Sequence, residues 1–340
     1  MIKEQEVDSF FNQMVEDSQF SAAVLVADRS GIVLKGGYGQ ANDSSGTPVT
    51  PDTISDIGSI SKQFTATAIL QLESQGLLNI NTSINQYLLG VPKDKTAITL
   101  HHLLTHTAGF DEEHSKDDLT PQNREEALQA ILGQSLGFSP GGEYIYSNSG
   151  YTLLAAIIEI ITGQSFTNYL HQNFLNPNRM ESTGFYNDSW IGKSVANGYF
   201  NAQDQGKPSE WDGPYWGVIG NGGVMSTVGD LYIWWQALQN NQILPPVQKD
   251  KLFTRHIEEF SRSYYGYGWT LQETPFGDLI THNGGGIGGN SDFAFYQDQG
   301  IIIIITSNRI IIHTDDDDNP TKIDLPATKA RSKLAHELFG

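Results

Sequence analysis

The chain opens with a helical pattern of apolar residues that soon changes to a strand pattern. Between Phe10 and Val15 apolar side chains recur at helical spacing, which predicts an amphipathic helix. Residues 21–39 then predict two strands joined by a turn at Arg29–Gly31.

The middle of the chain is predicted to be mainly helical. The segments with the strongest helical period are Ile60–Leu77, Leu100–Thr105, Glu125–Leu132, Tyr151–Thr162 and Asp230–Leu238. Stretches rich in Gly, Pro, Asn and Asp separate them, notably Ser139–Glu143 and Asn201–Gly223, and these predict loops.

Strand patterns return in the last quarter of the chain, and a helix follows them. The predicted strands are residues 263–272, 278–282, 291–297 and 301–307. Asp298–Gly300 predicts a hairpin turn between the last two, and an amphipathic helix is expected from about Lys322 to Leu338.

Strands at both ends with helices between them predict an α/β (α+β) fold. We expect an antiparallel sheet, flanked by helices and built from both chain ends, with a mostly helical insertion. Residues 1–58 and 241–340 would form the discontinuous sheet domain, and residues 59–240 the helical domain. The active site is expected in the cleft between them, where small-molecule sites commonly form.

Charge and composition exclude several classes of function. The 340 residues carry a formal net charge of −19, which repels phosphate backbones and anionic lipids, so neither nucleic acid nor membrane is expected as a partner. There is no cysteine, which removes thiol nucleophiles and disulfides. The N-terminal segment has no apolar signal-peptide core, so we expect a soluble, cytoplasmic protein, exported only if a signal has been removed.

Ser59 and Lys62 are the first candidates for catalysis. Ile60, Phe64 and Ala68 form an apolar stripe, so Ser59 would stand at the start of a helix, where the helix dipole favours negative charge. Lys62 would lie one turn further along the same face, within reach of the serine hydroxyl. The alternative is a capping serine beside a solvated lysine.

A tyrosine triplet and a glycine-rich segment are the next candidates. Tyr146-Ser147-Asn148 directly precedes a strongly predicted helix, whereas a second Tyr-x-Asn triplet, at Tyr199, lies near a predicted loop. The segment from His282 predicts a strand end followed by a glycine-dense turn, which could direct backbone N–H groups toward an oxyanion. An ordinary buried tyrosine and a plain hairpin turn are the alternatives.

Together and in this order, these segments resemble the serine β-lactamase-like family. That family contains class C β-lactamases, D-alanyl-D-alanine carboxypeptidases, D-aminopeptidases and related esterases. The resemblance spans roughly Ser21 to Ser307. The segments that carry it are DIGSISKQFTATAILQL, ITLHHLLTHTAGF, PGGEYIYSNSGYTLLAAIIE, NGGVMSTVGDLYIWWQAL and DLITHNGGGIGGNSDF.

The resemblance implies a role for each candidate residue and a serine β-lactamase/DD-peptidase-like fold. Ser59 would be the nucleophile, Lys62 and Tyr146 the proton carriers, and Asn148 a hydrogen-bonding wall. The backbone N–H groups of Ser59 and Gly285 would form the oxyanion hole.

The sequence departs from the family pattern at one segment. His282, Asn283 and Gly284 stand where many members have Lys-Thr-Gly, which weakens β-lactamase activity as a prediction. His106 lies in a family segment and is interpreted as structural. The two Gly-x-Ser-x-Gly patterns, at residues 133–137 and 137–141, follow a predicted helix and not a strand, so neither predicts the strand-to-helix elbow of an α/β-hydrolase.

The predicted function is a serine hydrolase that forms an acyl-enzyme on Ser59. Its substrate would be a small amide or peptide of the D-amino-acid type, or an ester. The alternatives are a β-lactamase proper and, from another class, a non-catalytic binding protein on the same fold. No cofactor is expected.

No metal is expected either. His102 and His106 stand four residues apart but lack the rest of a zinc-protease motif. The acidic run Asp315–Asp318 lacks the glycine and the glutamate of a calcium loop.

Overall fold

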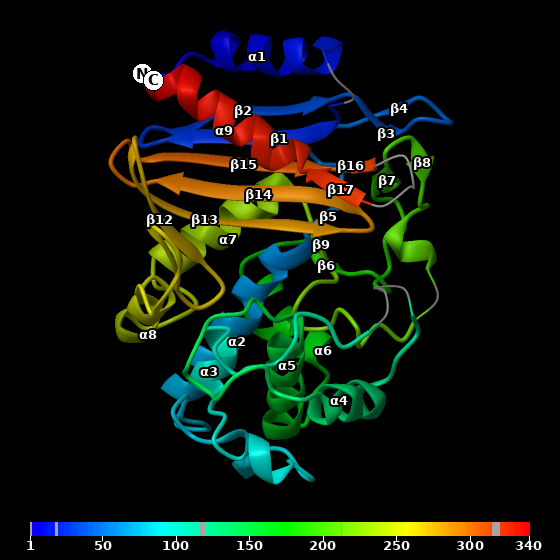
Figure 1. Ribbon diagram of the computed structural model, residues 1–340. Helices are drawn as coiled ribbons and strands as arrows, with labels where there is room; N and C mark the ends of the chain where they lie inside the picture. Colours follow the sequence, from blue (N-terminus) through cyan, green and yellow to red (C-terminus); the bar gives the residue numbers. More distant parts are fainter. Residues whose placement is uncertain (1, 18–19, 116–119, 212, 315–319) are drawn as a thin grey trace.

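A large antiparallel sheet forms the upper half of the molecule in the computed structural model (Figure 1). The structure describes residues 2–17, 20–115, 120–211, 213–314 and 320–340, so the acidic run 315–318 lies outside the described residues. The sheet has eight strands in the order β10-β11-β12-β13-β14-β15-β1-β2. Their bounds are β1 Ala22–Asp28, β2 Gly31–Tyr38, β10 Ile257–Phe260, β11 Ser263–Tyr265, β12 Thr270–Thr274, β13 Gly277–Gly286, β14 Gly289–Tyr296 and β15 Ile301–Ser307.

The two ends of the chain meet inside this sheet. β1 pairs with β15 in an antiparallel register that places Ala22 opposite Ser307. The turn between β14 and β15 is where the sequence predicts it, and Gly300 there has the positive φ of 67° that such a turn needs. The expectation of an antiparallel sheet built from both chain ends is therefore confirmed.

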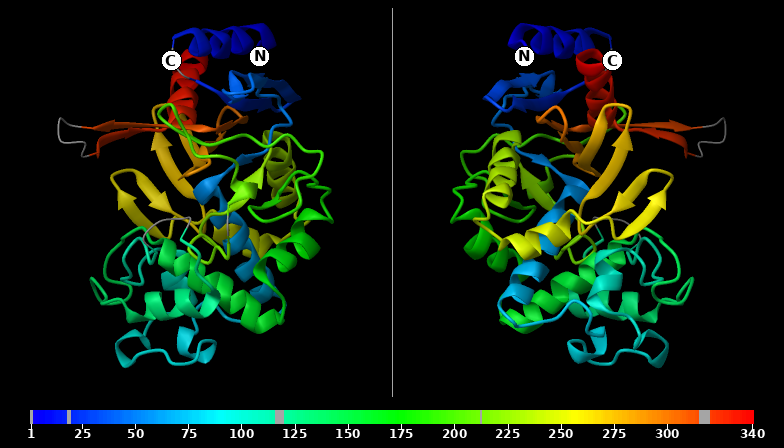
Figure 2. Two further views of the ribbon diagram at one scale, coloured as in Figure 1. Left: turned by 90° about the vertical axis from the view of Figure 1, so that its right-hand side faces the viewer. Right: turned by 90° about the vertical axis from the view of Figure 1, so that its left-hand side faces the viewer.

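Strand alternation divides the sheet into two buried faces. Ala23 and Leu25 on β1, with Ile304 on β15, face the large core shared with the helices. Val24 on β1 and Ile303 on β15 face the opposite side, where α1 (Glu4–Asp17) and α9 (Pro326–Phe339) cover them. Figure 2 shows α1 and α9 together on this outer side, with most other helices beyond the opposite face.

The remaining helices lie below the sheet. They are α2 Ser61–Ser74, α3 Leu100–Leu104, α4 Arg124–Gly133, α5 Asn148–Thr162, α6 Phe166–Leu170, α7 Val228–Gln239 and α8 Pro246–Leu252. The short helical turns are η1 Gly58–Ile60, η2 Ile84–Gln86, η3 Lys93–Lys95, η4 His171–Leu175 and η5 Pro208–Glu210. Among the described helices, none combines the length and apolar character needed to cross a bilayer.

The shorter strands form smaller sheets, in the orders β17-β16-β7-β8, β3-β4 and β5-β9-β6. They are β3 Gln40–Asn42, β4 Thr47–Pro48, β5 Ser55–Asp56, β6 Gly184–Phe185, β7 Tyr199–Phe200, β8 Gln203–Asp204, β9 Val224–Ser226, β16 Arg309–Thr314 and β17 Pro320–Asp324. β5 pairs with β9, which brings the segment before Ser59 beside the segment that leads into α7.

One predicted strand is divided in the structure, and the last helix begins later than the sequence predicts. Residues 263–272 form two strands, β11 and β12, because the backbone turns back at residues 266–268. The last helix begins at Pro326 and not near Lys322, since Lys322 belongs to β17 and pairs with β16. Over so few residues, the alternation of a strand cannot be distinguished from the first turn of an amphipathic helix. The helix was therefore predicted to begin too early.

α2 occupies the centre of the molecule (Figure 1). Every residue from Ser61 to Leu70 is buried, including the polar ones. Phe64 stacks on Trp234 of α7 with ring centroids 4.1 Å apart, and the hydroxyl of Thr65 donates to the carbonyl of Gly220. The helix that begins beside Ser59 is therefore held from several sides, which suits a site that must keep a fixed geometry.

Candidate active site

The turn that carries Ser59 is stabilised by a buried aspartate. Asp56 of β5 accepts hydrogen bonds from the N–H of Gly58 and from the hydroxyl of Tyr186, at 2.8 and 2.7 Å. Gly58 has a positive φ of 50°, which lets the chain enter η1 just before the nucleophile candidate. Ser59 lies within this turn, one residue before Ile60, the N-cap residue of α2.

Lys62 lies beside Ser59 and is completely buried. Its Nζ donates to Ser59 Oγ at 3.1 Å, to Asn148 Oδ1 at 2.6 Å and to the backbone carbonyl of Asn221 at 2.9 Å. Three acceptors match the three N–H bonds of an ammonium group. This geometry corresponds to a charged lysine that is satisfied by neutral oxygens.

Asn148 is fixed in one orientation by two opposite partners. Its Oδ1 accepts from Lys62, while its Nδ2 donates to Glu113 Oε1 at 2.5 Å. Asn148 is the first residue of α5, and Ser147 is the N-cap, with its hydroxyl accepting from the N–H of Gly150. The helix therefore begins three residues earlier than predicted, and its start presents Asn148 to the lysine.

Tyr146 completes the group around the serine hydroxyl. The Lys62 ammonium lies 4.8 Å from the centroid of its ring, and the phenol shares a hydrogen bond with Ser59. Burial raises the pKa of Tyr146 above its ordinary value, and the hydrogen bond with Ser59 partly opposes that shift. The resting phenol is therefore neutral at pH 7.

The glycine-rich segment is a strand where a turn was predicted. β13 does not end at His282 but continues through Asn283, Gly284 and Gly285 to Gly286, paired with β14. The glycines are required by a close approach to η1. A Cβ on Gly284 would lie 2.9 Å from the Ser59 nitrogen, and one on Gly58 would lie 2.7 Å from the Gly285 nitrogen. Because this segment pairs with β14 as a strand, its glycine content reflects contact with η1 and not a turn.

The backbones of Ser59 and Gly285 thus lie on the same side of the cleft. Both residues line one cavity of 580 Å³, together with Tyr146 and Asn148. The arrangement suits the predicted oxyanion hole, because it requires two N–H groups beside the nucleophile. That role stays a prediction.

His282 is buried and makes two hydrogen bonds within the protein. Its Nδ1 lies 2.6 Å from the carbonyl of Asn283, and its Nε2 lies 3.0 Å from the hydroxyl of Tyr265. A carbonyl can only accept, so the proton is on Nδ1 and Tyr265 donates to Nε2. Burial and the charge of Lys62 lower the pKa of His282 to about 4, so the ring is neutral at pH 6 to 7.

The cavity around Ser59 is acidic. Glu112 and Glu113 line it from the segment before α4, and Glu259 lines it from β10. Glu259 accepts hydrogen bonds from Thr270, Ser263 and Tyr144, all through neutral hydroxyls, and burial raises its pKa. Among the described lining residues the one permanent cation is Arg331 of α9, whose Nε donates to the buried Asp292 at 3.1 Å.

Several residues of this site have no signal in the sequence. Asp56 is an isolated acidic residue three positions before Ser59 and belongs to no motif. Asn221 contributes only its backbone carbonyl, and it lies in a segment predicted as a loop. Glu113 and Glu259 reach the cavity from segments far apart in the chain. A motif spaced for one helix cannot reveal such contacts.

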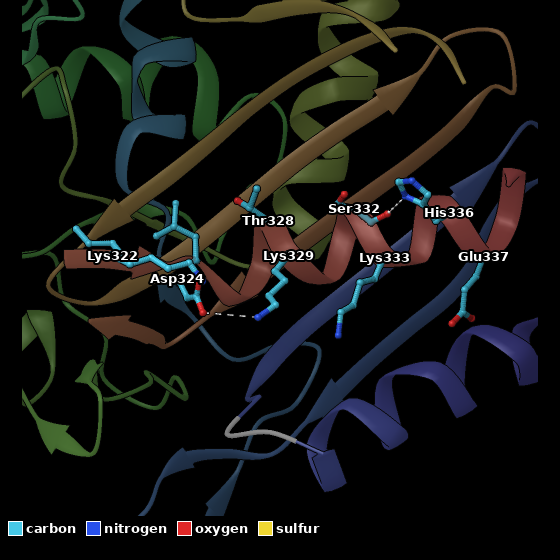
Figure 3. Close-up of a pocket in the computed structure, with 10 residues that line it drawn as sticks. Lys322, Asp324, Thr328, Lys329, Ser332, Lys333, His336 and Glu337 are labelled. Carbon is cyan, nitrogen blue, oxygen red and sulfur yellow. Dashed lines mark hydrogen bonds and ion pairs between the residues drawn. The ribbon is translucent and has the colours of Figure 1, made fainter. Parts of the chain in front are cut away.

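A second hollow, of 960 Å³, lies along α9 on the outer side of the sheet (Figure 3). Lys329 there is 3.6 Å from Asp324, and Lys333 and Glu337 point outward from the helix. It contains no paired nucleophile and base comparable to Ser59 and Lys62. In the described ranges, no group of three or more His, Asp or Glu side chains is placed to hold a metal ion.

Comparison with known proteins identifies the family. The model of the Beta-lactamase family matches residues 7–327, nearly the whole chain. The chain belongs to the Beta-lactamase family. The resemblance inferred from the sequence is thereby confirmed.

Two curated relatives show how similar in sequence the chain is to known proteins. The chain is similar to penicillin-binding protein 4* of Bacillus subtilis (strain 168), with 27% identity over 303 residues that cover 83% of this chain and 67% of the relative. It is 28% identical over 304 residues to protein flp of Staphylococcus aureus (strain COL), covering 83% of this chain. The match spans only 58% of the length of protein flp.

Solved structures of the family share the fold. A penicillin-binding protein from Bacillus halodurans superposes with a TM-score of 0.81 at 24% identity, covering 98% of this chain and 99% of that one. A D-amino acid amidase from Ochrobactrum anthropi SV3 gives a TM-score of 0.80 at 20% identity, covering 90% and 91%. Membership of this family supports a serine hydrolase in general.

Proposed function

We propose that this protein is a serine hydrolase that forms an acyl-enzyme on Ser59 and cleaves small amides or peptides of the D-amino-acid type, or esters. One observation carries the proposal: Lys62 Nζ lies 3.1 Å from Ser59 Oγ, and the same hydroxyl is hydrogen-bonded to Tyr146. A nucleophile in contact with two potential proton carriers is the arrangement that covalent acyl transfer needs.

The chemistry follows from these contacts. Ser59 Oγ attacks the substrate carbonyl carbon, and its proton passes to the Lys62–Tyr146 pair. The negative oxygen of the tetrahedral intermediate is bound by the N–H groups of Ser59 and Gly285. The leaving group takes the proton as its bond to carbon breaks. Water then attacks the acyl-enzyme through the same groups, releasing the acid and restoring Ser59.

The resting pair must lose one proton before it can act as a base. In the described geometry Lys62 uses three N–H bonds as a donor, and the Tyr146 phenol is kept neutral by burial. Rates should therefore rise with pH on the acidic side of the profile. Because the two groups interact, the apparent pKa belongs to the pair and not to one residue.

The charge of the cavity favours substrates with a free amine. Glu112, Glu113 and Glu259 provide negative charge, whereas the positive charge of Arg331 is already balanced by Asp292. His282 is neutral at the working pH and offers no cation to a substrate carboxylate. These features favour amino-acid amides and esters over β-lactams and over peptides that must be bound by a C-terminal carboxylate.

The first experiment tests the nucleophile. A fluorophosphonate probe should label the wild type, and Ser59→Ala should abolish both labelling and turnover while the fold, followed by circular dichroism, is unchanged. A labelled Ser59→Ala variant, or one retaining more than a few per cent of kcat, would refute the assignment. An unlabelled but folded wild type would favour the non-catalytic binding protein.

The second experiment tests the substrate class. D- and L-amino-acid amides, p-nitrophenyl esters with and without a free amine, and nitrocefin should be compared by kcat/KM. We expect the amine-bearing esters and D-amides to be the best substrates and nitrocefin the worst. Nitrocefin as the best substrate would instead identify a β-lactamase proper.

A matched pair of variants isolates the effect of charge. Glu259→Gln should lower the ratio of kcat/KM between amine-bearing and neutral esters by about three- to tenfold, because it removes one charge from a partly buried site. Glu258→Gln is the control, since its exposed side chain lies on the opposite face of β10. If both variants gave the same ratio of kcat/KM between amine-bearing and neutral esters, Glu259 would not interact with the charge of the substrate.

A further inference from the structure

His106 lies directly behind the proposed catalytic tyrosine. It follows α3, is 1% exposed, and its ring centroid is 4.4 Å from that of Tyr146 and 4.5 Å from that of Tyr265. Its backbone has a positive φ of 58°, a conformation uncommon for a residue with a side chain. Such backbone outliers persist where the surrounding structure requires them, which directs attention to what this residue holds.

His106 accepts two hydrogen bonds from the backbone N–H groups of the residues on either side of Tyr146 in the chain. The imidazole Nδ1 accepts from the N–H of Ser147 at 3.0 Å. The backbone carbonyl of His106 accepts from the N–H of Ile145 at 3.1 Å. The residues immediately before and after Tyr146 are thus both bound by the same residue, while its ring packs against the tyrosine ring.

The protonation state of the ring follows from this geometry. Because an N–H donates to Nδ1, the ring proton is on Nε2, which is buried and has no hydrogen-bond partner among the described residues. Burial, with the charges of Lys62 and His282, holds the pKa of His106 well below its usual value. A ring that stays neutral and faces no substrate is unsuited to proton transfer.

We propose that His106 is a positioning residue for Tyr146, which fixes the tyrosine against Ser59 through the Ser147 amide and the ring contact. The inference rests on the proposed function, because the position of Tyr146 affects the rate only if Tyr146 takes part in catalysis. A phenylalanine at this position could fill the space, but it could not accept the Ser147 N–H and would leave that donor buried and unpaired.

Two variants at position 106 separate the ring from the backbone. His106→Gly keeps the left-handed backbone but removes the ring and the acceptor. His106→Asn also tolerates this backbone and retains a side-chain carbonyl. His101→Asn is the matched control, since it removes a half-buried imidazole from the same segment, where its partner is Tyr267.

The expected result is a loss in kcat rather than in binding. His106→Gly should lower kcat and the rate of fluorophosphonate labelling about tenfold or more, a part of the usual contribution of acid–base catalysis, with KM nearly unchanged. His106→Asn should lose less, and His101→Asn should remain within about twofold of the wild type. Thermal unfolding of all three variants reports whether stability alone has changed.

A double-mutant cycle with Tyr146→Phe decides the question. If His106 acts through Tyr146, His106→Gly should have little further effect on kcat in the Tyr146→Phe background, because residues that act as a unit are not additive. The same fold-loss in both backgrounds would overturn the proposal. Failure of the proposed function would appear differently, as an unlabelled wild type or a fully active Tyr146→Phe variant.

A spectroscopic measurement does not depend on any variant being active. The imidazole ¹⁵N resonances of the wild type, with His106 assigned by its absence in His106→Asn, should show an unprotonated Nδ1 and a protonated Nε2 from about pH 5 to 8. If that His106→Asn fails to fold, the coupling between Nδ1 and the Ser147 amide gives the assignment. A protonated Nδ1 would exclude the Ser147 hydrogen bond and with it the proposal.

Discussion

The chain contains the triplet Tyr-x-Asn twice, and the two copies have different surroundings. Tyr146 precedes α5 and lies between a buried lysine and a serine hydroxyl. Tyr199 lies in β7, where its hydroxyl accepts from the N–H of Asp43 at 2.9 Å and the Arg309 guanidinium lies 4.6 Å from its ring centroid. The first tyrosine faces a cavity, and the second joins neighbouring segments.

The asparagines differ in the same way. Asn148 is directed by Glu113 so that its oxygen meets Lys62. Asn201 has a positive φ of 54° and makes two hydrogen bonds to the backbone of Ile312 in β16. The proposed catalytic role therefore belongs to the triplet that the start of α5 holds beside Ser59 and Lys62.

The largest contrast is expected between the two tyrosines. Tyr146→Phe should lower kcat by about 10²-fold or more, the usual scale for loss of a general acid or base. Tyr199→Phe should leave kcat within about twofold, but should lower the free energy of unfolding by about 1 kcal/mol, because the N–H of Asp43 loses its acceptor. Steady-state kinetics and urea unfolding measure the two effects.

The reverse ranking of the two phenylalanine variants would transfer the catalytic role to position 199. A mixed outcome, in which both lower kcat to the same extent, would show that the triplets are coupled through the fold.

The two asparagines should differ by a smaller factor. Asn148→Ala removes an acceptor from the buried Lys62 ammonium and should lower kcat about tenfold, with a shifted pH profile. Asn201→Ala places an ordinary residue in a left-handed conformation and should cost about 1–2 kcal/mol of stability with little change in kcat. A pH profile of Asn148→Ala identical to that of the wild type would separate this residue from the lysine.

A separate expected effect concerns the acid stability of the region around the first triplet. His282 titrates at about 4 in the folded protein and near 6.5 when unfolded. The unfolded state therefore binds more protons between these values, and the folded state loses stability as pH falls through that window. One such group contributes about 3 kcal/mol at most over the full window.

His282→Gln should remove this contribution. Its free energy of unfolding should fall less steeply than that of the wild type between pH 6.5 and 4.5. The exposed His336, replaced in the same way, is the control. Parallel curves for His282→Gln and the wild type would mean that the ring is not buried as described.

Much of the fold could be predicted because its elements are long and strongly periodic. The continuous hydrophobic run 301–307 is typical of a buried strand, and residues 151–162 have a clear helical period; both elements were confirmed. The sequence could not show that β13 continues past His282, because glycines are typical of turns as well as of strands in close contact with another backbone. That choice depends on η1, which lies far away in the sequence.

The site residues could likewise be predicted where their contacts are local in the sequence, and not where they are distant. Ser59 and Lys62 are three residues apart, so helical spacing alone predicts their contact. The Asn221 carbonyl and the carboxylates of Glu113 and Glu259 have no local pattern, because they enter the cavity by tertiary packing. The neutral state of His282 likewise depends on burial and on a distant lysine.

The pairing of β1 with β15 has a consequence for synthesis of the chain on the ribosome. The pairing of β1 with β15 can form only after Ser307 has been synthesised. β13, which lies against the turn that carries Ser59, is also synthesised late. Contacts so distant in sequence slow folding, since loop closure must precede the gain from pairing. A nascent chain that already contains Ser59, Lys62 and Tyr146 therefore still lacks Gly285, so the proposed active site can form only after β13 has been synthesised.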